Sequence, residues 1–379
     1  MIKTKLNEDL FDKIKENSRI VIFGAGEVGK KIFNDVKKEK PSVQILGFID
    51  NFQKGLCLGL PIWSIKQFID SKTNIDLVVM STRTAYTVIS NIFDVFDIPV
   101  LLQTIAVSDY YRGNKQILNA ENYTKIENLF PKNEDKALFK LLFEARNTCD
   151  TDRINSYHLA RYGNTNFLNF VSIKDHYLDK VNKDSIKIIL DVGANSGLNV
   201  IAFNKLLPNL EKTYGFEVIY DIARKSFIEE FILNDKFELV PFALGDSEKS
   251  SRFFIDRNSS GGSFCADLSN RKITLDDTRW KEITINTTTM DKYCEKNKIR
   301  PDFIKMDIEG AELAALKGGL KTIKKYRPQL AISIYHSNED FINIPLFLSE
   351  NLEEYIFSIG HYTPRITETV LYAIPKELA

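Results

Sequence analysis

Apolar runs and amphipathic segments alternate along this chain in two separate series. The first series has largely β-branched runs at residues 20–23, 44–49, 77–80 and 100–102, with amphipathic stretches through Lys38 and near 84–96. Short apolar runs that alternate with segments of helical period indicate a parallel α/β sheet. We therefore expect a small sheet of four or five strands, finished by about residue 110.

The second series opens with a nearly continuous apolar run at residues 186–192, as a strand covered on both faces requires. Further strands are expected at residues 212–217, 237–244, 303–307 and 329–334. The runs at residues 355–359 and 369–373 are too close together for a crossover helix. They predict an antiparallel hairpin.

The residues between the two series lack strand alternation and contain a helical pattern at residues 134–146, with Leu138, Leu141 and Leu142 on one face. The expected fold class is therefore α/β, with two Rossmann-like domains joined by a mostly helical connector. The domains are expected at residues 1–110 and 185–379, and the connector at 111–184. Its last part, residues 167–184, is expected to lie across the mouth of the second domain.

Length, charge and cysteine content narrow the class of protein. A chain of 379 residues exceeds the usual size of a single core, in keeping with two domains. Lysine plus arginine equals aspartate plus glutamate at 51 each. The protein therefore has no strong net electrostatic field that would attract nucleic acid or an anionic membrane. The first ten residues lack an apolar signal region, and no apolar run approaches the ~20 residues of a membrane span, which predicts a cytoplasmic protein. The four cysteines lie far apart, which predicts reduced thiols and neither disulfides nor a zinc site.

A glycine-containing loop, DVGANSG at residues 191–197, follows the first strand of the second domain. Glycines allow a sharp turn and a close approach of a ligand to the backbone. Glu217 ends the next strand, where a carboxylate can accept hydrogen bonds from two ribose hydroxyls. Both adenosylmethionine and NAD present such a ribose. Asp191 favours adenosylmethionine, because it would repel a pyrophosphate and attract the ammonium group of a methionine moiety.

The candidate cofactor contacts share a position at the carboxyl ends of the first three strands of this domain; they are Asp191, Gly193, Ala194, Asn195, Gly197, Glu217 and Asp246. Asp246 could meet an adenine edge or cap a turn. The loop at residues 258–263 has the small, polar composition of a lid over the site or of a surface turn, and the sequence favours neither.

The strand at residues 303–307 carries two charged side chains on one face, Lys305 and Asp307. A buried lysine needs a partner, and Asp307 is the nearest candidate. Glu309 and Glu312 open the next helix, where acids complement the helix dipole. For Glu312 we prefer this helix-dipole role. Glu309 lies nearer the crevice, and both the helix-dipole role and a role in the site stay open.

The next strand ends in His336, beside Asp307 if the two strands are neighbours. Methyl transfer to an oxygen requires an in-line arrangement and removal of the proton of the acceptor. We expect His336 to be the general base and Asp307 to orient the acceptor or the imidazole, with Lys305 and Glu309 completing the catalytic set. A divalent metal held by Asp307 and Glu309 is the second choice and is not expected.

Six motifs in this order, DVGANSG, YGFE, ALGD, FIKMDIEGAELAALKGG, RPQLAISIYH and TETVLYAI, resemble the FkbM family of methyltransferases over about residues 165–375. The resemblance implies a class I methyltransferase fold, S-adenosylmethionine as methyl donor, and O-methylation of a hydroxyl. The acceptor in this family is often a sugar in polysaccharide, glycolipid or natural-product pathways. By position, the resemblance places Asp307 and His336 near the acceptor. It places six of the candidate contacts at the cofactor; they are Asp191, Gly193, Asn195, Gly197, Glu217 and Asp246. Val218 stands where many relatives have proline.

The first domain has a glycine motif of its own, in which Gly24, Gly26 and Gly29 follow a strand and precede a helix, and Asp50 ends the next strand. This region resembles small Rossmann-like domains of sugar-modifying transferases, which bind a nucleotide-sugar. The resemblance places phosphates at the loop and a ribose or base at Asp50. The alternative is a domain used for packing or dimer contacts.

The sequence thus predicts a cytoplasmic O-methyltransferase that acts on a sugar or glycan hydroxyl, which could be nucleotide-linked. Two other functions stay open. One is an NAD-dependent oxidoreductase that uses the glycine motif of the first domain. The other is a non-catalytic module that binds a nucleotide-sugar. Assembly into a homo-oligomer is also left open.

Overall fold

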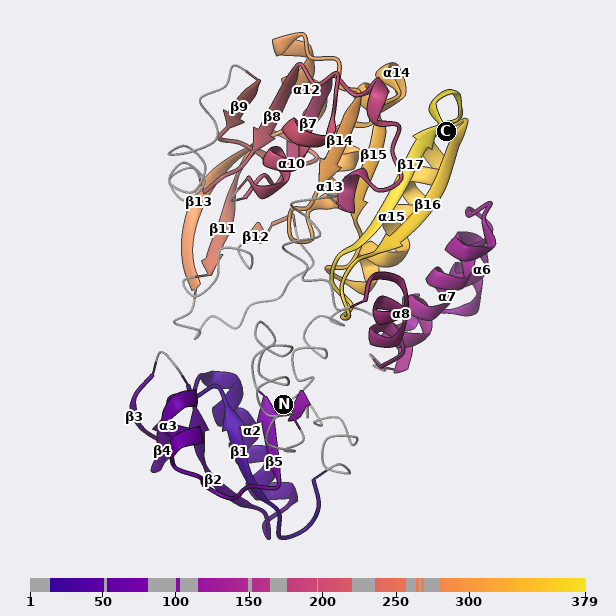
Figure 1. Ribbon diagram of the computed structural model, residues 1–379. Coiled ribbons are helices and arrows are strands. Elements are labelled where there is room, and N and C mark those ends of the chain that lie inside the picture. Colours follow the sequence, from indigo (N-terminus) through magenta and orange to yellow (C-terminus); the bar gives the residue numbers. More distant parts are fainter. Residues whose placement is uncertain are drawn as a thin grey trace. The chain divides into compact units, whose positions relative to one another are not determined.

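The computed structural model of the chain describes residues 14–50, 53–80, 100–102, 115–148, 152–163, 176–195, 197–219, 236–256, 264–265, 267–268 and 280–379. Contacts between residues divide the chain into two units, Met1–Asp109 and Tyr110–Ala379. Each unit contains its own parallel-dominated sheet (Figure 1). The three-part division expected from the sequence, with a separate connector over residues 111–184, stays a prediction.

The first unit is built on a six-stranded sheet in the order β3-β4-β2-β1-β5-β6. Its elements are β1 (Arg19–Phe23), α2 (Glu27–Glu39), β2 (Gln44–Ile49), β3 (Gly55–Cys57), β4 (Leu60–Trp63), α3 (Ile65–Asp70), β5 (Leu77–Met80) and β6 (Val100–Leu102). The strands β1, β2, β5 and β6 are parallel, as the apolar runs predict. The antiparallel hairpin β3–β4 brings the sheet to six strands, more than the four or five expected. It was not predicted because strands of three and four residues are too short to show alternation. The helix expected near 84–96 lies outside the described residues.

The second unit is organised around a seven-stranded sheet in the order β16-β17-β15-β14-β7-β8-β9 (Figure 1). Its strands are β7 (Ile188–Val192), β8 (Lys212–Phe216), β9 (Phe237–Val240), β14 (Phe303–Met306), β15 (Gln329–Ser333), β16 (Tyr355–His361) and β17 (Thr369–Pro375). Strand β17 runs antiparallel to both of its neighbours, β15 and β16, and the other pairings of this sheet are parallel. The structure confirms the α/β class and the predicted hairpin at the end of the sheet.

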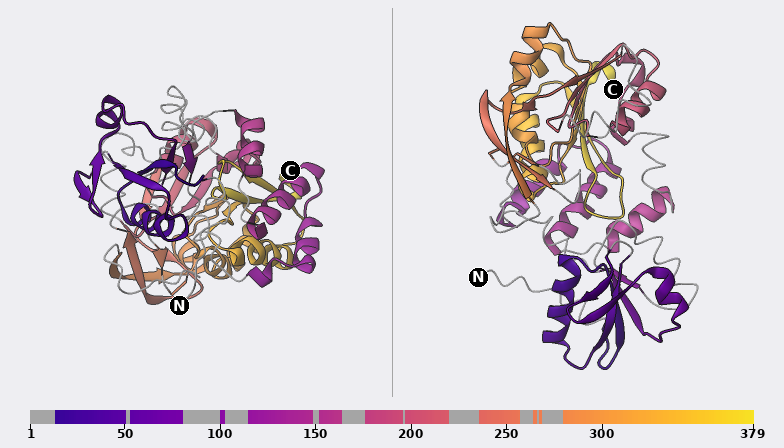
Figure 2. Two further views of the ribbon diagram at one scale, coloured as in Figure 1. Left: turned by 90° about the horizontal axis from the view of Figure 1, so that it is seen from below. Right: turned by 90° about the vertical axis from the view of Figure 1, so that its left-hand side faces the viewer.

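The strand order reverses at β7, which pairs with β8 on one side and with β14 on the other. Helix α10 (Leu198–Leu206) lies on one face of the sheet, and α12 (Met290–Asn297), α14 (Leu320–Tyr326) and α15 (Asn338–Asn351) lie on the other (Figure 2). The chain leaves β7 and β14 toward opposite faces, and at such a switch point a crevice is expected outside the carboxyl ends of the strands. The short helix α13 (Glu312–Lys317) follows β14 and contacts α15.

A second, four-stranded sheet in this unit was not predicted from the sequence. It has the order β10-β13-β11-β12, with β10 (Ala243–Leu244), β11 (Lys249–Asp256), β12 (Phe264–Cys265) and β13 (Trp280–Thr288). The alternating pattern of β13, with Ile283, Ile285 and Thr287 on one face, was the available signal. The buried side of the sheet packs against Val218 and Ile219, which follow β8. The four-stranded sheet therefore supplies an apolar wall beside the crevice.

Three helices, α6 (Ala120–Glu127), α7 (Asn133–Thr148) and α8 (Asp152–Tyr162), precede the sheet along the chain. Helix α7 contacts β16, and α6 contacts α15. Arg146 of α7 is buried and donates hydrogen bonds to the main-chain oxygen of Tyr335 at 3.1 Å and to Oδ1 of Asn338 at 3.3 Å. Its guanidinium also lies over the ring of Phe341, 4.5 Å from the centroid. These contacts of Arg146 therefore attach helix α7 to the loop after β15 and to the start of α15.

Short 3-10 turns complete the described structure; they are η1 (Lys115–Ile117), η2 (His176–Leu178), η3 (Lys183–Ser185) and η5 (Lys376–Leu378). Within the described ranges, no helix combines the length and apolar character that crossing a bilayer would need. Cys57, Cys265 and Cys294 are buried, and the thiol of Cys57 donates to the main-chain oxygen of Ala25 at 3.7 Å. The expectation of reduced thiols stays a prediction. Cys149 lies outside the described residues.

Candidate functional site

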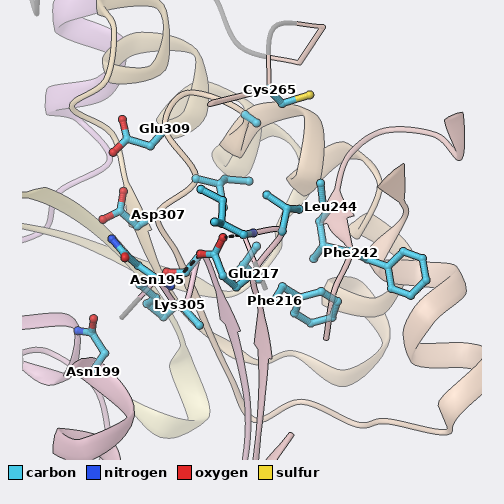
Figure 3. A pocket seen from close by; sticks show the side chains of 18 of the residues that line it. Asn195, Asn199, Phe216, Glu217, Phe242, Leu244, Cys265, Lys305, Asp307 and Glu309 are labelled. Atoms are coloured by element: carbon cyan, nitrogen blue, oxygen red, sulfur yellow. Dashed lines mark hydrogen bonds between the residues drawn. The ribbon is translucent and has the colours of Figure 1, made fainter. Parts of the chain in front are cut away.

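A pocket lies at the carboxyl ends of β7, β8 and β14, where the strand order reverses (Figure 3). The loop after β7 lines it with Gly193, Ala194 and Asn195, and Glu217 lines it from the end of β8. Figure 3 shows Glu217 near the centre of the pocket, with Asp307 and Glu309 on one side and Phe242 and Leu244 on the other. The structure thus brings together predicted residues that are up to 116 positions apart, from Gly193 to Glu309.

Gly193 allows the loops after β7 and β14 to touch. Its φ is +83°, and a Cβ atom built there would lie 1.9 Å from the main-chain oxygen of Asp307. Its N–H donates to the main-chain oxygen of Phe216 at 3.0 Å, which ties the loop to β8 as well. A side chain at this position would therefore separate the two walls of the pocket. Gly197, with φ of +76°, begins helix α10 and does not line the pocket among the described residues.

The buried Lys305 pairs with Asp191, so the prediction that Asp307 is its partner is wrong. Its Nζ lies 3.0 Å from Oδ1 of Asp191 and donates to the main-chain oxygen of Gly193 at 2.6 Å. The register explains this pairing, because Lys305 stands opposite Asp191 on the neighbouring strands β14 and β7. Asp191 is fully buried and, among the described residues, is absent from the pocket lining. Its expected contact with a methionine ammonium group therefore stays a prediction that this placement does not favour.

Glu217 is held in place by main-chain donors on both of its carboxylate oxygens. The N–H groups of Asn195 and Ile219 each donate to it at 2.9 Å. Burial raises the pKa of Glu217, and these hydrogen bonds and the charge of Lys305 act in the opposite direction. Each carboxylate oxygen keeps a second lone pair that can accept a hydrogen bond from a hydroxyl group.

The opposite wall of the pocket is apolar. Phe242, Ala243 and Leu244 line it from the region of β10, Phe253 lines it from β11, and Leu268 lines it from the turn after β12. A flat, largely apolar ring system can bind between such side chains.

Asp246, two residues beyond Leu244, is exposed. Its Oδ1 accepts a hydrogen bond from Ser247 and lies 3.6 Å from Nζ of Lys249. Both contacts are with side chains, so the turn-capping alternative stays a prediction, and among the described residues Asp246 is absent from the pocket lining.

Asp307 stands at the acidic end of the pocket and accepts hydrogen bonds from two tyrosines. Tyr177 donates to its Oδ2 at 2.8 Å, and the hydroxyl of Tyr335 lies 3.3 Å from both oxygens. Burial acts to raise the pKa of Asp307, but the charges of His336 and Lys305 and the Tyr177 hydrogen bond outweigh it, and the pKa is lowered. Asp307 is therefore an anion that can hold a polar group in the pocket.

His336 lies behind Asp307, surrounded by carboxylates. Its Nε2 is 3.3 Å from Oδ1 of Asp307 and 3.7 Å from Oε2 of Glu309, and its Nδ1 is 3.1 Å from Oε1 of Glu312. Burial alone would lower the pKa of His336, but Glu312, Glu309 and Asp307 together raise it to about 10. The sequence predicts His336 as a general base, and this pKa opposes that role because an imidazolium has no free lone pair at neutral pH.

Glu312, expected to complement the helix dipole, has a more specific position. It is fully buried at the start of α13 and accepts hydrogen bonds from the N–H groups of Ile308 at 2.8 Å and Gly310 at 3.0 Å. It therefore shapes the loop that carries Asp307 and Glu309, and it faces the ring of His336. Glu309 has a left-handed backbone with φ of +59°, a strained conformation for a side-chain-bearing residue.

Sequence reasoning missed His176, Tyr177 and Glu368, which also line the acidic end. Nε2 of His176 lies 3.2 Å from Oε2 of Glu368, and the His176 and Tyr177 rings are 4.0 Å apart between centroids. These residues belong to no apolar strand run. The one available signal was the expectation that residues 167–184 lie across the mouth of the domain. Of the described part of that segment, His176 and Tyr177 line the pocket.

In the glycine motif of the first unit, as in the loop after β7, a main-chain N–H donates to an acid at the end of the next strand. Oδ2 of Asp50 accepts a hydrogen bond from the N–H of Ala25 at 2.9 Å, and its Oδ1 accepts one from Gln53 at 3.1 Å. A Cβ atom on Gly29 would lie 1.9 Å from the main-chain oxygen of Gly24, so Gly29 permits close packing of α2 on β1. Gly26 precedes the first residue of α2. A nucleotide at this loop stays a prediction.

Comparisons with known proteins agree with this geometry. Residues 191–358 match the sequence model of the methyltransferase FkbM domain. The crystal structure of methyltransferase FkbM from Methylobacillus flagellatus KT is similar in fold, with a TM-score of 0.62 and 18% identity, over 96% of this chain and 92% of that chain. The precorrin-6y C5,15-methyltransferase from Geobacter metallireducens GS-15 has a TM-score of 0.32 at 12% identity, over 52% and 85% of the two chains, and we infer nothing from it. No curated protein sequence matches the chain.

The seven-stranded sheet with its reversed strand β17, and the pocket at its switch point, agree with the predicted class I methyltransferase fold. The matched residues of the second unit form a methyltransferase domain of the FkbM family, which confirms the resemblance seen in the sequence motifs.

The buried pair of Lys305 and Asp191 can be tested by a double-mutant cycle. We expect Lys305→Met and Asp191→Asn each to lower the free energy of unfolding of the second unit, with Lys305→Met costing about 3–5 kcal/mol because it leaves a buried carboxylate unpaired. The double variant should be more stable than the sum of the two losses predicts, by about 1–3 kcal/mol. Urea denaturation followed through Trp280, in a Trp63→Phe background, measures this. Strict additivity would show that the two charges are not coupled.

Proposed function

We propose that the second unit is an S-adenosylmethionine-dependent O-methyltransferase that acts on a hydroxyl of a sugar or glycan. The supporting observation is a single pocket with Glu217 held by backbone donors in its middle and the anion Asp307 at its end. The family match supports methyl transfer. The choice of an oxygen acceptor, and of a sugar, rests on the resemblance to FkbM methyltransferases.

The residues present fit S-adenosylmethionine. Glu217 would accept hydrogen bonds from the two ribose hydroxyls, and the loop from Gly193 to Asn195 lines the same pocket. The apolar wall that includes Phe242 and Leu244 suits an adenine ring. When bound, the donor supplies a methyl group on a cationic sulfur, which an acceptor oxygen displaces in line as it loses its proton.

The acidic end of the pocket would hold the acceptor and take its proton. Asp307 and Glu309 face the pocket, so their carboxylates can accept a hydrogen bond from an acceptor hydroxyl. Tyr177 and Tyr335 donate to Asp307 and fix its orientation. Because the pKa of His336 is about 10, we assign it the role of a positive partner to these acids instead of a general base.

For the first unit, the contact between Asp50 and the glycine loop supports a nucleotide-type ligand, such as the nucleotide part of an acceptor. An NAD-dependent oxidoreductase or a non-catalytic nucleotide-sugar module would use this unit, and neither explains the pocket of the second unit. A cytoplasmic location and a homo-oligomer stay predictions.

Binding of S-adenosylhomocysteine, the product of the proposed reaction, tests the cofactor assignment. We expect Glu217→Gln to weaken its binding at least about tenfold in calorimetric titrations, because hydrogen bonds from two hydroxyls to a charged acceptor are lost. Glu238→Gln, on the neighbouring strand β9 with a half-exposed carboxylate, is the matched control and should bind like the unaltered chain.

The same titrations distinguish the rival cofactor. Tight binding of NADH that S-adenosylhomocysteine cannot displace, or equal affinities of the Glu217→Gln and Glu238→Gln variants, would overturn the proposal. Purified enzyme incubated with S-adenosylmethionine and candidate glycans or nucleotide-sugars should then give a product heavier by one methyl group in mass spectra.

A further inference from the structure

The acidic end of the pocket has a cluster of potential metal ligands that the proposed mechanism does not fully use. Asp307, Glu312 and His336 each bring one ligand atom within 4.8 Å of the others. Glu309 adds a fourth group, with its Oε2 at 3.7 Å from Nε2 of His336. Asp307 and Glu309 line the pocket, and Figure 3 shows both on the same side of it.

The distances from the imidazole of His336 to the two pocket carboxylates are close to those expected for ligands of one shared ion. Two atoms bound at right angles to a small divalent cation, each about 2.1 Å from it, lie about 3.0 Å apart, and a tetrahedral arrangement separates them by about 3.4 Å. Nε2 of His336 lies 3.3 Å from Oδ1 of Asp307 and 3.7 Å from Oε2 of Glu309. Glu309, whose side chain is 21% exposed, lies outside the group within 4.8 Å and would have to move toward Asp307 and His336 to complete the set.

The imidazole of His336 gives an independent indication. Its side chain is 1% exposed, and neither ring nitrogen makes a hydrogen bond of good geometry within the described part of the chain. Its Nε2 is directed at the two pocket carboxylates. Its Nδ1 faces Glu312, whose carboxylate is fixed by the N–H groups of Ile308 and Gly310. A carboxylate behind a histidine is the usual arrangement that orients a metal-binding imidazole.

The charges around the cluster also favour a cation. Three carboxylates, those of Asp307, Glu309 and Glu312, face one imidazole, and Asp340 of α15 adds a fourth nearby acid. The positive charge of Lys305 is already engaged by Asp191 and by the main-chain oxygen of Gly193. A divalent ion bound at Nε2 would replace the proton that His336 carries there without metal, and its larger charge would offset more of the negative charge at the pocket wall.

We propose that Asp307, Glu309 and His336 bind one divalent cation of the Mn²⁺ or Mg²⁺ class at the acceptor end of the pocket, with Glu312 as the residue that orients His336. One nitrogen and two carboxylate oxygens form a mixed donor set that Mn²⁺ accepts. The ion would leave coordination positions open toward the pocket, where an acceptor hydroxyl could bind and become more acidic. This role rests on the proposed function, but the binding of the ion does not.

Titration of the full chain with Mn²⁺, followed by the paramagnetic resonance signal of the free ion, measures the binding directly. We expect one Mn²⁺ per chain, and we expect Glu309→Gln to weaken binding at least about tenfold. Glu350→Gln, which alters an exposed acid of α15, is the matched control and should bind like the unaltered chain. Glu309 is partly exposed and its substitution does not create a cavity, so loss of folding would not mimic the result.

Electron spin-echo envelope modulation of the bound Mn²⁺ shows whether a histidine nitrogen is one of its ligands. We expect a coupling to one imidazole nitrogen that changes when histidine is labelled with ¹⁵N, that is lost in His336→Gln, and that persists in His176→Gln. Absence of binding at millimolar Mn²⁺, equal affinities of the Glu309→Gln and Glu350→Gln variants, or a bound ion without nitrogen coupling would each overturn the inference. Parallel titration with S-adenosylhomocysteine separates this failure from failure of the proposed function, because that ligand requires Glu217 and not the ion.

Discussion

The buried ammonium of Lys305 is the contact on which the geometry of the site depends. It joins the carboxylate of Asp191 on β7 and the main-chain oxygen of Gly193 in the following loop, while its own strand, β14, continues into Asp307. One charged group therefore fixes the glycine loop against the strand that delivers the acidic residues. Its burial would be costly without both partners, so the pairing and the loop position support each other.

The pocket that results has two electrostatically different parts. Around Glu217 and the apolar wall, the protein offers one carboxylate with backbone donors and a broad nonpolar surface, which suits a nucleoside. At the other end, Asp307, Glu309 and Glu312 surround His336, and Tyr177 and Tyr335 direct hydroxyl groups at Asp307. This separation gives the nucleoside and the acceptor distinct places, and a reacting methyl group would lie between them.

Much of this arrangement could be predicted from the sequence, because the ends of parallel strands meet at one edge. The apolar runs located β7, β8, β14 and β15, and with them Glu217, Asp307 and His336. The partner of Lys305 could not be predicted, since it depends on the register between β14 and β7. The protonation of His336 depends on three acids meeting around it, which no local pattern reveals. The apolar wall was missed because its strands form a separate sheet whose alternation was overlooked.

A crystal structure of the chain with S-adenosylhomocysteine tests the central claim most directly. We predict that both ribose hydroxyls contact the carboxylate of Glu217, that the adenine lies against Phe242 and Leu244, and that the sulfur faces Asp307 and Glu309. A ligand bound elsewhere, or a dinucleotide in this pocket in preference to S-adenosylhomocysteine, would contradict it.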